Sequence, residues 1–132
     1  MGKFEKFMYK RQQSFGEPMA TITKHRNINL NLAVMTNYVK DNEYATLYFN
    51  REDELIGIQF SKKEKPEAYK IRKYRSGKFG NVTGMAFFKY YNITHKETKA
   101  YHVEWDEQEQ MLILDLKEHV EENSEQDDEV PF

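Results

Sequence analysis

The sequence contains no cysteine, only three prolines and a single tryptophan among its 132 residues. Without cysteine the chain can form no disulfide and offers no thiolate as nucleophile or metal ligand. It has no run of about 18 apolar residues, so we expect no membrane-spanning helix. Residues 1–6 are not followed by the long apolar stretch of a secretory signal. Together these absences favour a cytoplasmic protein.

Patterns typical of catalysis and of metal binding are also missing. The four histidines are scattered, without the spacing of a metal site. No serine lies in a nucleophile-elbow context, and no glycine-rich phosphate loop occurs. The acids near residues 50–53 and 106–109 fit solvated turns. We therefore predict a protein that is not an enzyme and uses no metal or cofactor.

Charge is divided unevenly along the chain. The net charge is only −2, yet residues 118–132 carry seven acids and no base. Residues 1–117 therefore hold 20 basic and 15 acidic side chains. A basic body with an acidic tail suits binding of a polyanion by the body, which leaves the tail for another partner.

The last six residues form a motif of their own, Asp127-Asp128-Glu129-Val130-Pro131-Phe132. A terminal phenylalanine offers a ring for an apolar pocket and a carboxylate for a basic one. The acids before it attract a basic partner surface over long range, and the proline stiffens the approach. An ordinary solubilising tail is the alternative interpretation.

This ending resembles the C-terminal tip of bacterial single-stranded DNA-binding proteins, in which an acidic run leads to an apolar residue, proline and a terminal phenylalanine. The resemblance implies that the tip docks onto replication, repair or recombination proteins. We also expect a homo-oligomer.

The body, residues 18–117, is predicted to be an α+β domain with a curved antiparallel sheet. It would lie between an N-terminal extension (1–17) and a disordered acidic tail (118–132). Period-two alternation predicts strands, and helical spacing predicts two short helices, the first capped by Asn31. The expected strands are 20–24, 27–31, 44–49, 55–60, 69–74, 101–105 and 111–116, and the expected helices are 32–39 and 85–91.

These elements describe two strand-helix-hairpin repeats, at about 18–60 and 69–117. The hairpins match at a shift of 56 residues, which places the inward apolar face of Ile56, Ile58 and Phe60 on that of Leu112, Leu114 and Leu116. The strand-to-helix junctions match at a shift of 54, with Asn27 on Asn81. The phrase at residues 24–31, a basic strand leading into a helix, resembles the positive-cofactor-four and Whirly class of single-strand binders. That class usually ends on a long helix, which has no counterpart after Leu116. A five-stranded oligonucleotide-binding barrel fits less well, because it normally has one helix.

Binding of single strands requires cations along a groove and aromatic faces for the bases. Residues 62–80 hold eight bases against two acids, with three rings interleaved. Alternation places Lys70, Arg72 and Tyr74 on one face of a strand. The predicted DNA-binding set is Lys24, Arg26, Tyr44, Tyr48, Tyr69, Lys70, Arg72, Lys73, Tyr74, Arg75, Lys78 and Phe79. Five other large rings, Phe49, Phe60, Phe87, Phe88 and Trp105, occupy expected core positions. A solvated sheet face with cross-strand ion pairs is the alternative.

The sequence therefore predicts a protein that coats single-stranded DNA during replication or recombination and recruits partners through its tip. Two rival functions stay open. One is a transcription or RNA-binding module of the same fold class. The other is an inhibitor that carries the tip without binding DNA.

Overall fold

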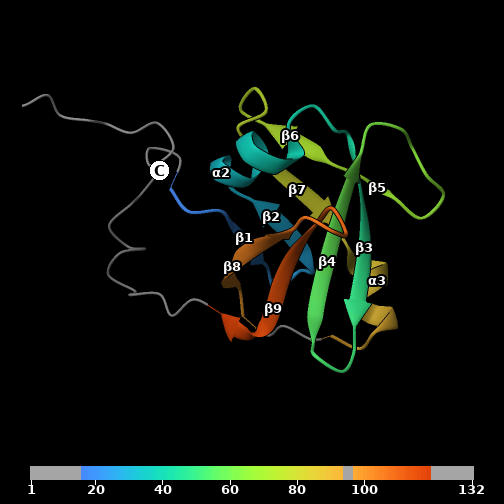
Figure 1. The fold of residues 1–132 in the computed structure, drawn as a ribbon. Coiled ribbons are helices and arrows are strands. Elements are labelled where there is room, and N and C mark those ends of the chain that lie inside the picture. Colours follow the sequence, from blue (N-terminus) through green and yellow to red (C-terminus); the bar gives the residue numbers. More distant parts are fainter. Residues whose placement is uncertain (1–15, 94–96, 120–132) are drawn as a thin grey trace, which may run out of the picture.

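The computed structural model describes residues 16–93 and 97–119 (Figure 1). Within these residues, nine antiparallel strands form one sheet that curls into a nearly closed barrel. The strands are β1 (Met19–Ile22), β2 (Asn27–Leu30), β3 (Tyr44–Asn50), β4 (Leu55–Ser61), β5 (Tyr69–Lys70), β6 (Arg72–Tyr74), β7 (Phe79–Thr83), β8 (Lys99–Asp106) and β9 (Met111–His119). The tip, Asp127 to Phe132, lies outside the described residues, as does nearly all of the expected N-terminal extension.

The barrel approaches closure because its two edge strands are neighbours in the chain. The strand order is β5-β3-β4-β9-β8-β1-β2-β7-β6, and only Ile71 separates β5 from β6. The Ile71 side chain is buried, and its amide donates to the carbonyl of Glu43 at 2.9 Å. The expected single strand at 69–74 is thus split at this residue, and its two parts pair with β3 and β7. Little unpaired edge is left for other chains to join.

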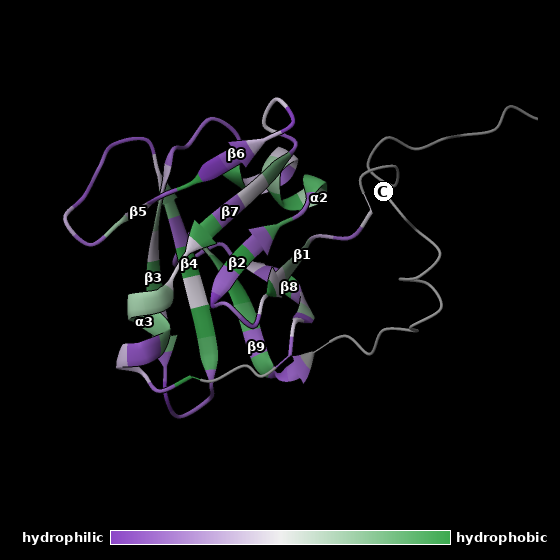
Figure 2. Cartoon of the chain, turned by 180° about the vertical axis from the view of Figure 1, so that it is seen from behind, coloured by the Kyte–Doolittle hydropathy of each residue, from purple (hydrophilic) through white to green (hydrophobic). Residues whose placement is uncertain are grey.

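Alternating side chains fill the barrel. On β4 and β9, Ile56 lies opposite Leu114 and Ile58 opposite Leu112, and all four are fully buried. In Figure 2, green segments, which mark apolar residues, recur along both strands. These residues were expected on the inward face of the two hairpins, and that expectation is confirmed.

Two short helical segments pack toward opposite ends of the barrel in Figure 1. The first joins α2 (Leu32–Val34) to the π-helix η1 (Met35–Val39), and the second is α3 (Met85–Tyr90). Asn31 caps the first as predicted, since its Oδ1 accepts from the Val34 amide at 3.1 Å. Gly84 precedes α3 where a side chain would crowd its neighbours, because an added Cβ would lie 3.2 Å from Leu47 Cδ1.

The predicted antiparallel sheet and the two short helices are therefore confirmed. The sheet dominates, however, so the structure is mainly β rather than evenly α+β, and it curls further than expected. β9 also continues to His119, beyond the expected end at Leu116. In the described part of the chain, no helix has the length and apolar character needed to cross a membrane.

Candidate nucleic-acid interface

One side of the barrel is built from segments without carboxylates. The sequence has no Asp or Glu between Glu17 and Asp41, and none between Glu67 and Glu97. These two stretches carry ten lysines and arginines and supply β1, β2, β5, β6, β7 and both helical segments. The strand order places β1, β2, β7 and β6 side by side, so the stretches meet in one surface. Sequence reasoning missed this feature, although both acid-free runs can be read from the sequence.

We call the outward side chains of these four strands the β2–β7 face, after its two central strands, which face the viewer in Figure 2. Its main members are Thr21, Asn29, Arg72, Tyr74, Phe79, Asn81 and Thr83. Tyr74 and Phe79 are paired across β6 and β7, and their exposed fractions are 47% and 39%. The Arg75 guanidinium lies 5.9 Å from the Phe79 ring centroid. Two rings and a cation are thus presented together to solvent.

A row of hydrogen bonds crosses the centre of the face. Arg72 Nη2 donates to Asn81 Oδ1 at 3.2 Å, and Asn81 Nδ2 donates to Asn29 Oδ1 at 2.6 Å. The three residues sit in register on β6, β7 and β2. The bond to Asn81 orients the guanidinium and uses one of its nitrogens, so further N–H donors remain for an anion.

A shallow pocket of about 320 Å³ lies between the rings and the amides. Tyr74 and Phe79 line one part of it, and Thr21, Asn29 and Asn31 line another. Gly80 forms part of the floor, where an added Cβ would lie only 2.7 Å from Met35 Sδ on η1. Glycine therefore lets β7 pack closely on η1, and the pocket above it combines stacking surface with hydrogen-bonding groups.

Cationic turns close both ends of the face. The turn between β1 and β2 carries Lys24 and Arg26, and the turn between β6 and β7 carries Arg75 and Lys78. Since Asn27 pairs with Thr83, and β7 begins at Phe79, the two turns lie roughly 13 Å apart along β7. Arg26 and Arg75 both have positive φ, 66° and 54°, as tight turns require.

The predicted DNA-binding residues therefore divide into three groups. Seven lie on the β2–β7 face or its turns, namely Lys24, Arg26, Arg72, Tyr74, Arg75, Lys78 and Phe79. A second group lies on the outer side of β3 and β5, where Lys70 Nζ is 5.6 Å from the Tyr44 ring and the Tyr48 hydroxyl donates to Gln59 Oε1 at 3.2 Å. The last two residues are half-buried and already have partners, because Tyr69 packs against the core and Lys73 forms an ion pair with Glu43 at 3.6 Å.

The groups with clearly shifted pKa values lie elsewhere on the barrel. A hydrogen bond from Lys62, together with its charge, lowers the pKa of Asp41. A hydrogen bond from the Lys117 side chain likewise lowers the pKa of Asp115. Burial raises the pKa of Tyr101 to about 12. Among residues 16–93 and 97–119, no group of three or more acidic or histidine side chains is placed to hold a metal ion. The chemistry that the β2–β7 face offers is stacking, hydrogen bonding and attraction of anions.

Comparison with known proteins finds no family model, no curated protein and no solved structure that matches this chain. The site is therefore interpreted from its own geometry.

Proposed function

We propose that the protein binds single-stranded DNA through the β2–β7 face. The observation that carries this proposal is the exposure of Tyr74 and Phe79 side by side, next to two arginines, on a side of the barrel whose segments hold no carboxylate. Exposed rings can stack on nucleobases, and the neighbouring cations can hold the phosphates. Cations at both ends of the face would guide a strand across it.

Single strands fit this face better than duplex does. The pocket beside Tyr74 and Phe79 is large enough for a nucleobase, and a base can enter it only when it is unstacked. Reading of duplex DNA usually requires a helix or a two-stranded ribbon in the major groove. The helix α3 has only six residues, and its Phe87 and Phe88 are buried in the core.

We also infer that the barrel consists of two copies of a strand-helix-hairpin unit. At the shift of 56, Ile56 corresponds to Leu112 and Ile58 to Leu114. If each residue is replaced by its counterpart in the other copy, the observed pair Ile56–Leu114 becomes Leu112–Ile58, which is also an observed pair. At the shift of 54, the β2–β7 pairing likewise maps onto itself. The proposed face then lies across the boundary between the copies, with β2 from one and β7 from the other.

In the proposed role, the protein coats single-stranded DNA in replication or recombination. The tip, from Asp127 to Phe132, would recruit processing enzymes by its acids and terminal ring. A homo-oligomer would present several tips and so bind its partners with avidity.

Fluorescence anisotropy with a labelled single strand, a matched duplex and a matched RNA tests the proposal. We expect tightest binding to the DNA single strand. If about five phosphates are neutralised, log affinity should fall with log salt at a slope of about −3.5. Preference for RNA would favour the transcription or RNA-binding alternative, and equal binding to duplex would contradict the proposed role of the rings.

Deleting residues 120–132 should leave single-strand affinity unchanged or higher, because the deletion removes six acids that repel or compete with DNA. The cut leaves β9 complete to His119. A full-length control in which the six acids become amides should behave like the deletion. If neither the intact chain nor the folded deletion variant binds DNA, the protein is better explained as an inhibitor that carries the tip.

A further inference from the structure

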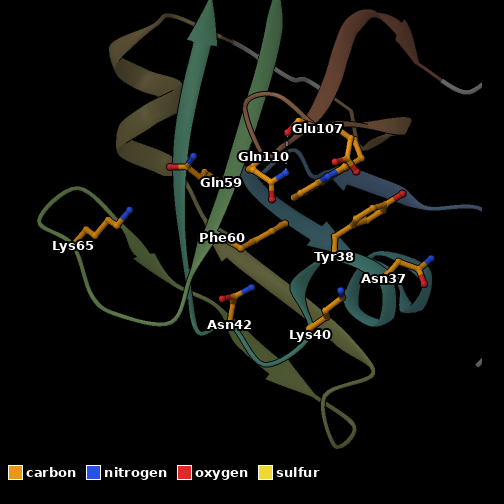
Figure 3. A pocket seen from close by; sticks show the side chains of 10 residues that line it. Asn37, Tyr38, Lys40, Asn42, Gln59, Phe60, Lys65, Glu107 and Gln110 are labelled. Carbon is orange, nitrogen blue, oxygen red and sulfur yellow. Dashed lines mark hydrogen bonds between the residues drawn. The ribbon is translucent and has the colours of Figure 1, made fainter.

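A second and larger pocket, of about 630 Å³, lies between η1, the end of β4 and the loop of the β8–β9 hairpin (Figure 3). Three rings line it, namely Tyr38 of η1, Phe60 of β4 and Trp105 of β8. Tyr38 and Trp105 are stacked, with centroids 4.9 Å apart and planes 10° from parallel. The sequence assigned Phe60 and Trp105 to the core, and both do pack against it, yet each also forms part of this wall.

Polar groups surround the rings. Lys40 and Lys65 approach from separate segments, and both line the pocket (Figure 3). The side-chain amide of Asn42 donates from Nδ2 to the backbone carbonyl of Val39 at 2.9 Å. The side-chain amide of Gln110 donates from Nε2 to the backbone carbonyl of Glu107 at 2.8 Å. These bonds fix both amide groups and leave their oxygens as acceptors. A ligand that matches the pocket is flat, forms hydrogen bonds at its edge and carries negative charge.

The corresponding region at the other end of the barrel holds a smaller pocket, of about 410 Å³, whose ring is covered by a cation of the protein itself. There Tyr91 lies 4.9 Å from Phe49 and 5.1 Å from Phe87, and the Arg51 guanidinium covers its ring at 5.0 Å. The shift of 56 places Glu107 at the position of Arg51, so no guanidinium covers the pocket of Tyr38. Among the described residues, Trp105 is the one ring stacked on Tyr38.

The pocket and the β2–β7 face share a structural element. Met35 lies beneath Gly80 of the face, and Tyr38, three residues later on the same helix η1, lines the pocket. Helix η1 therefore borders both the face and the pocket. The two lysines favour an anionic ligand such as a nucleic-acid strand over an uncharged ligand such as a sugar.

We propose that this pocket is a second base-binding site, which receives one nucleotide of the bound single strand. The base stacks on the Tyr38–Trp105 wall, the amides of Asn42 and Gln110 bond its edge, and Lys40 and Lys65 hold the adjacent phosphates. The Glu107 carboxylate can accept from an exocyclic amine. The inference rests on the proposed single-strand binding and adds a site to it.

Trp105 is the only tryptophan in the chain, so tryptophan fluorescence reports on the surroundings of this one side chain, which include the pocket. We expect oligodeoxythymidylate to change Trp105 emission in a saturable way. The double variant Lys40→Ala, Lys65→Ala should weaken binding about tenfold and lower the salt slope by about 1.4, because two phosphate contacts are lost. The matched control Lys63→Ala, Lys89→Ala removes the same charge from exposed positions outside the pocket and should have a smaller effect.

The failure of this proposal can be distinguished from failure of the proposed function. If anisotropy shows tight single-strand binding while Trp105 emission stays constant and the lysine variant matches its control, the pocket is not a base site and the β2–β7 face stands. If Trp105 responds even when Tyr74 and Phe79 are replaced by alanine, the pocket stands without the face. Thymidine monophosphate with the same affinity as the oligonucleotide would assign the pocket to free nucleotides and overturn the strand proposal.

Discussion

Replacing Tyr74 and Phe79 together by alanine is expected to weaken single-strand binding by about 2–6 kcal/mol, which is at least roughly 30-fold in dissociation constant. Each ring on which a base stacks contributes about 1–3 kcal/mol, and these two lie opposite each other on β6 and β7. Anisotropy titration at fixed salt measures the loss. The salt slope should stay unchanged, because the substitutions remove no cation.

The matched control is Tyr90→Ala. Tyr90 is the most exposed large apolar side chain of the described residues, at 75%, and it lies on α3 rather than on the β2–β7 face. Its removal should leave affinity unchanged. A third variant, Arg72→Ala with Arg75→Ala, should lower the slope by about 1.4 and so separate phosphate contacts from stacking. Equal losses from the Tyr90 variant and from the ring pair would contradict the assignment of the face.

Local features of this fold could be predicted because their signals are short in sequence. The alternation at Ile56 and Ile58, and its repeat at Leu112 and Leu114, marks an inward face with period two. Asn31 is followed directly by an apolar helical block, and it caps that helix as expected. Tyr74 and Phe79 lie close together in the basic run at 62–80, so both were assigned to the binding set, although the strand β7 that carries Phe79 was not predicted.

Features that depend on distant pairing could not be predicted in this way. Asn29 and Asn81 are 52 residues apart, and only the register of β2 against β7 brings them into hydrogen-bonding contact. At Ile71 the chain leaves its pairing with β3 and begins to pair with β7. The alternation of residues 69–74 does not indicate this change of partner. Lys73 belongs to the basic run, yet its ion pair with Glu43 depends on how the barrel closes.

The pocket of Tyr38 and Trp105 shows a second limit. Inward positions near the ends of strands and helices have the same period as core positions, so Trp105 and Phe60 were assigned to the interior. In the barrel these positions reach the rim, where a ring can pack on the core and still line a cavity. The alternation of apolar residues predicts which side of the sheet a side chain lies on. Its exposure also depends on which loops cover that end of the barrel.

Phe88→Ala is expected to destabilise the fold by about 3–5 kcal/mol. The Phe88 side chain is fully buried, packs edge-on against Phe87 at 5.5 Å, and approaches Gly84 so closely that an added Cβ there would be 3.3 Å from its ring. Removing the ring leaves a cavity beneath α3 that the surrounding strands can fill only in part. Urea unfolding followed by circular dichroism measures the change.

The neighbouring variant Lys89→Ala is the control, since its side chain is exposed on the same helix and should change stability by less than about 0.5 kcal/mol. A small domain has about 5–15 kcal/mol of stability, so a loss of about 3–5 kcal/mol should leave the Phe88 variant with a folded population in the absence of denaturant. Its remaining folded fraction should then bind DNA with normal affinity, because Phe88 does not reach the β2–β7 face. A loss below about 1 kcal/mol would mean that α3 unfolds separately from the barrel, and a fully folded variant with reduced binding would mean that α3 takes part in holding DNA.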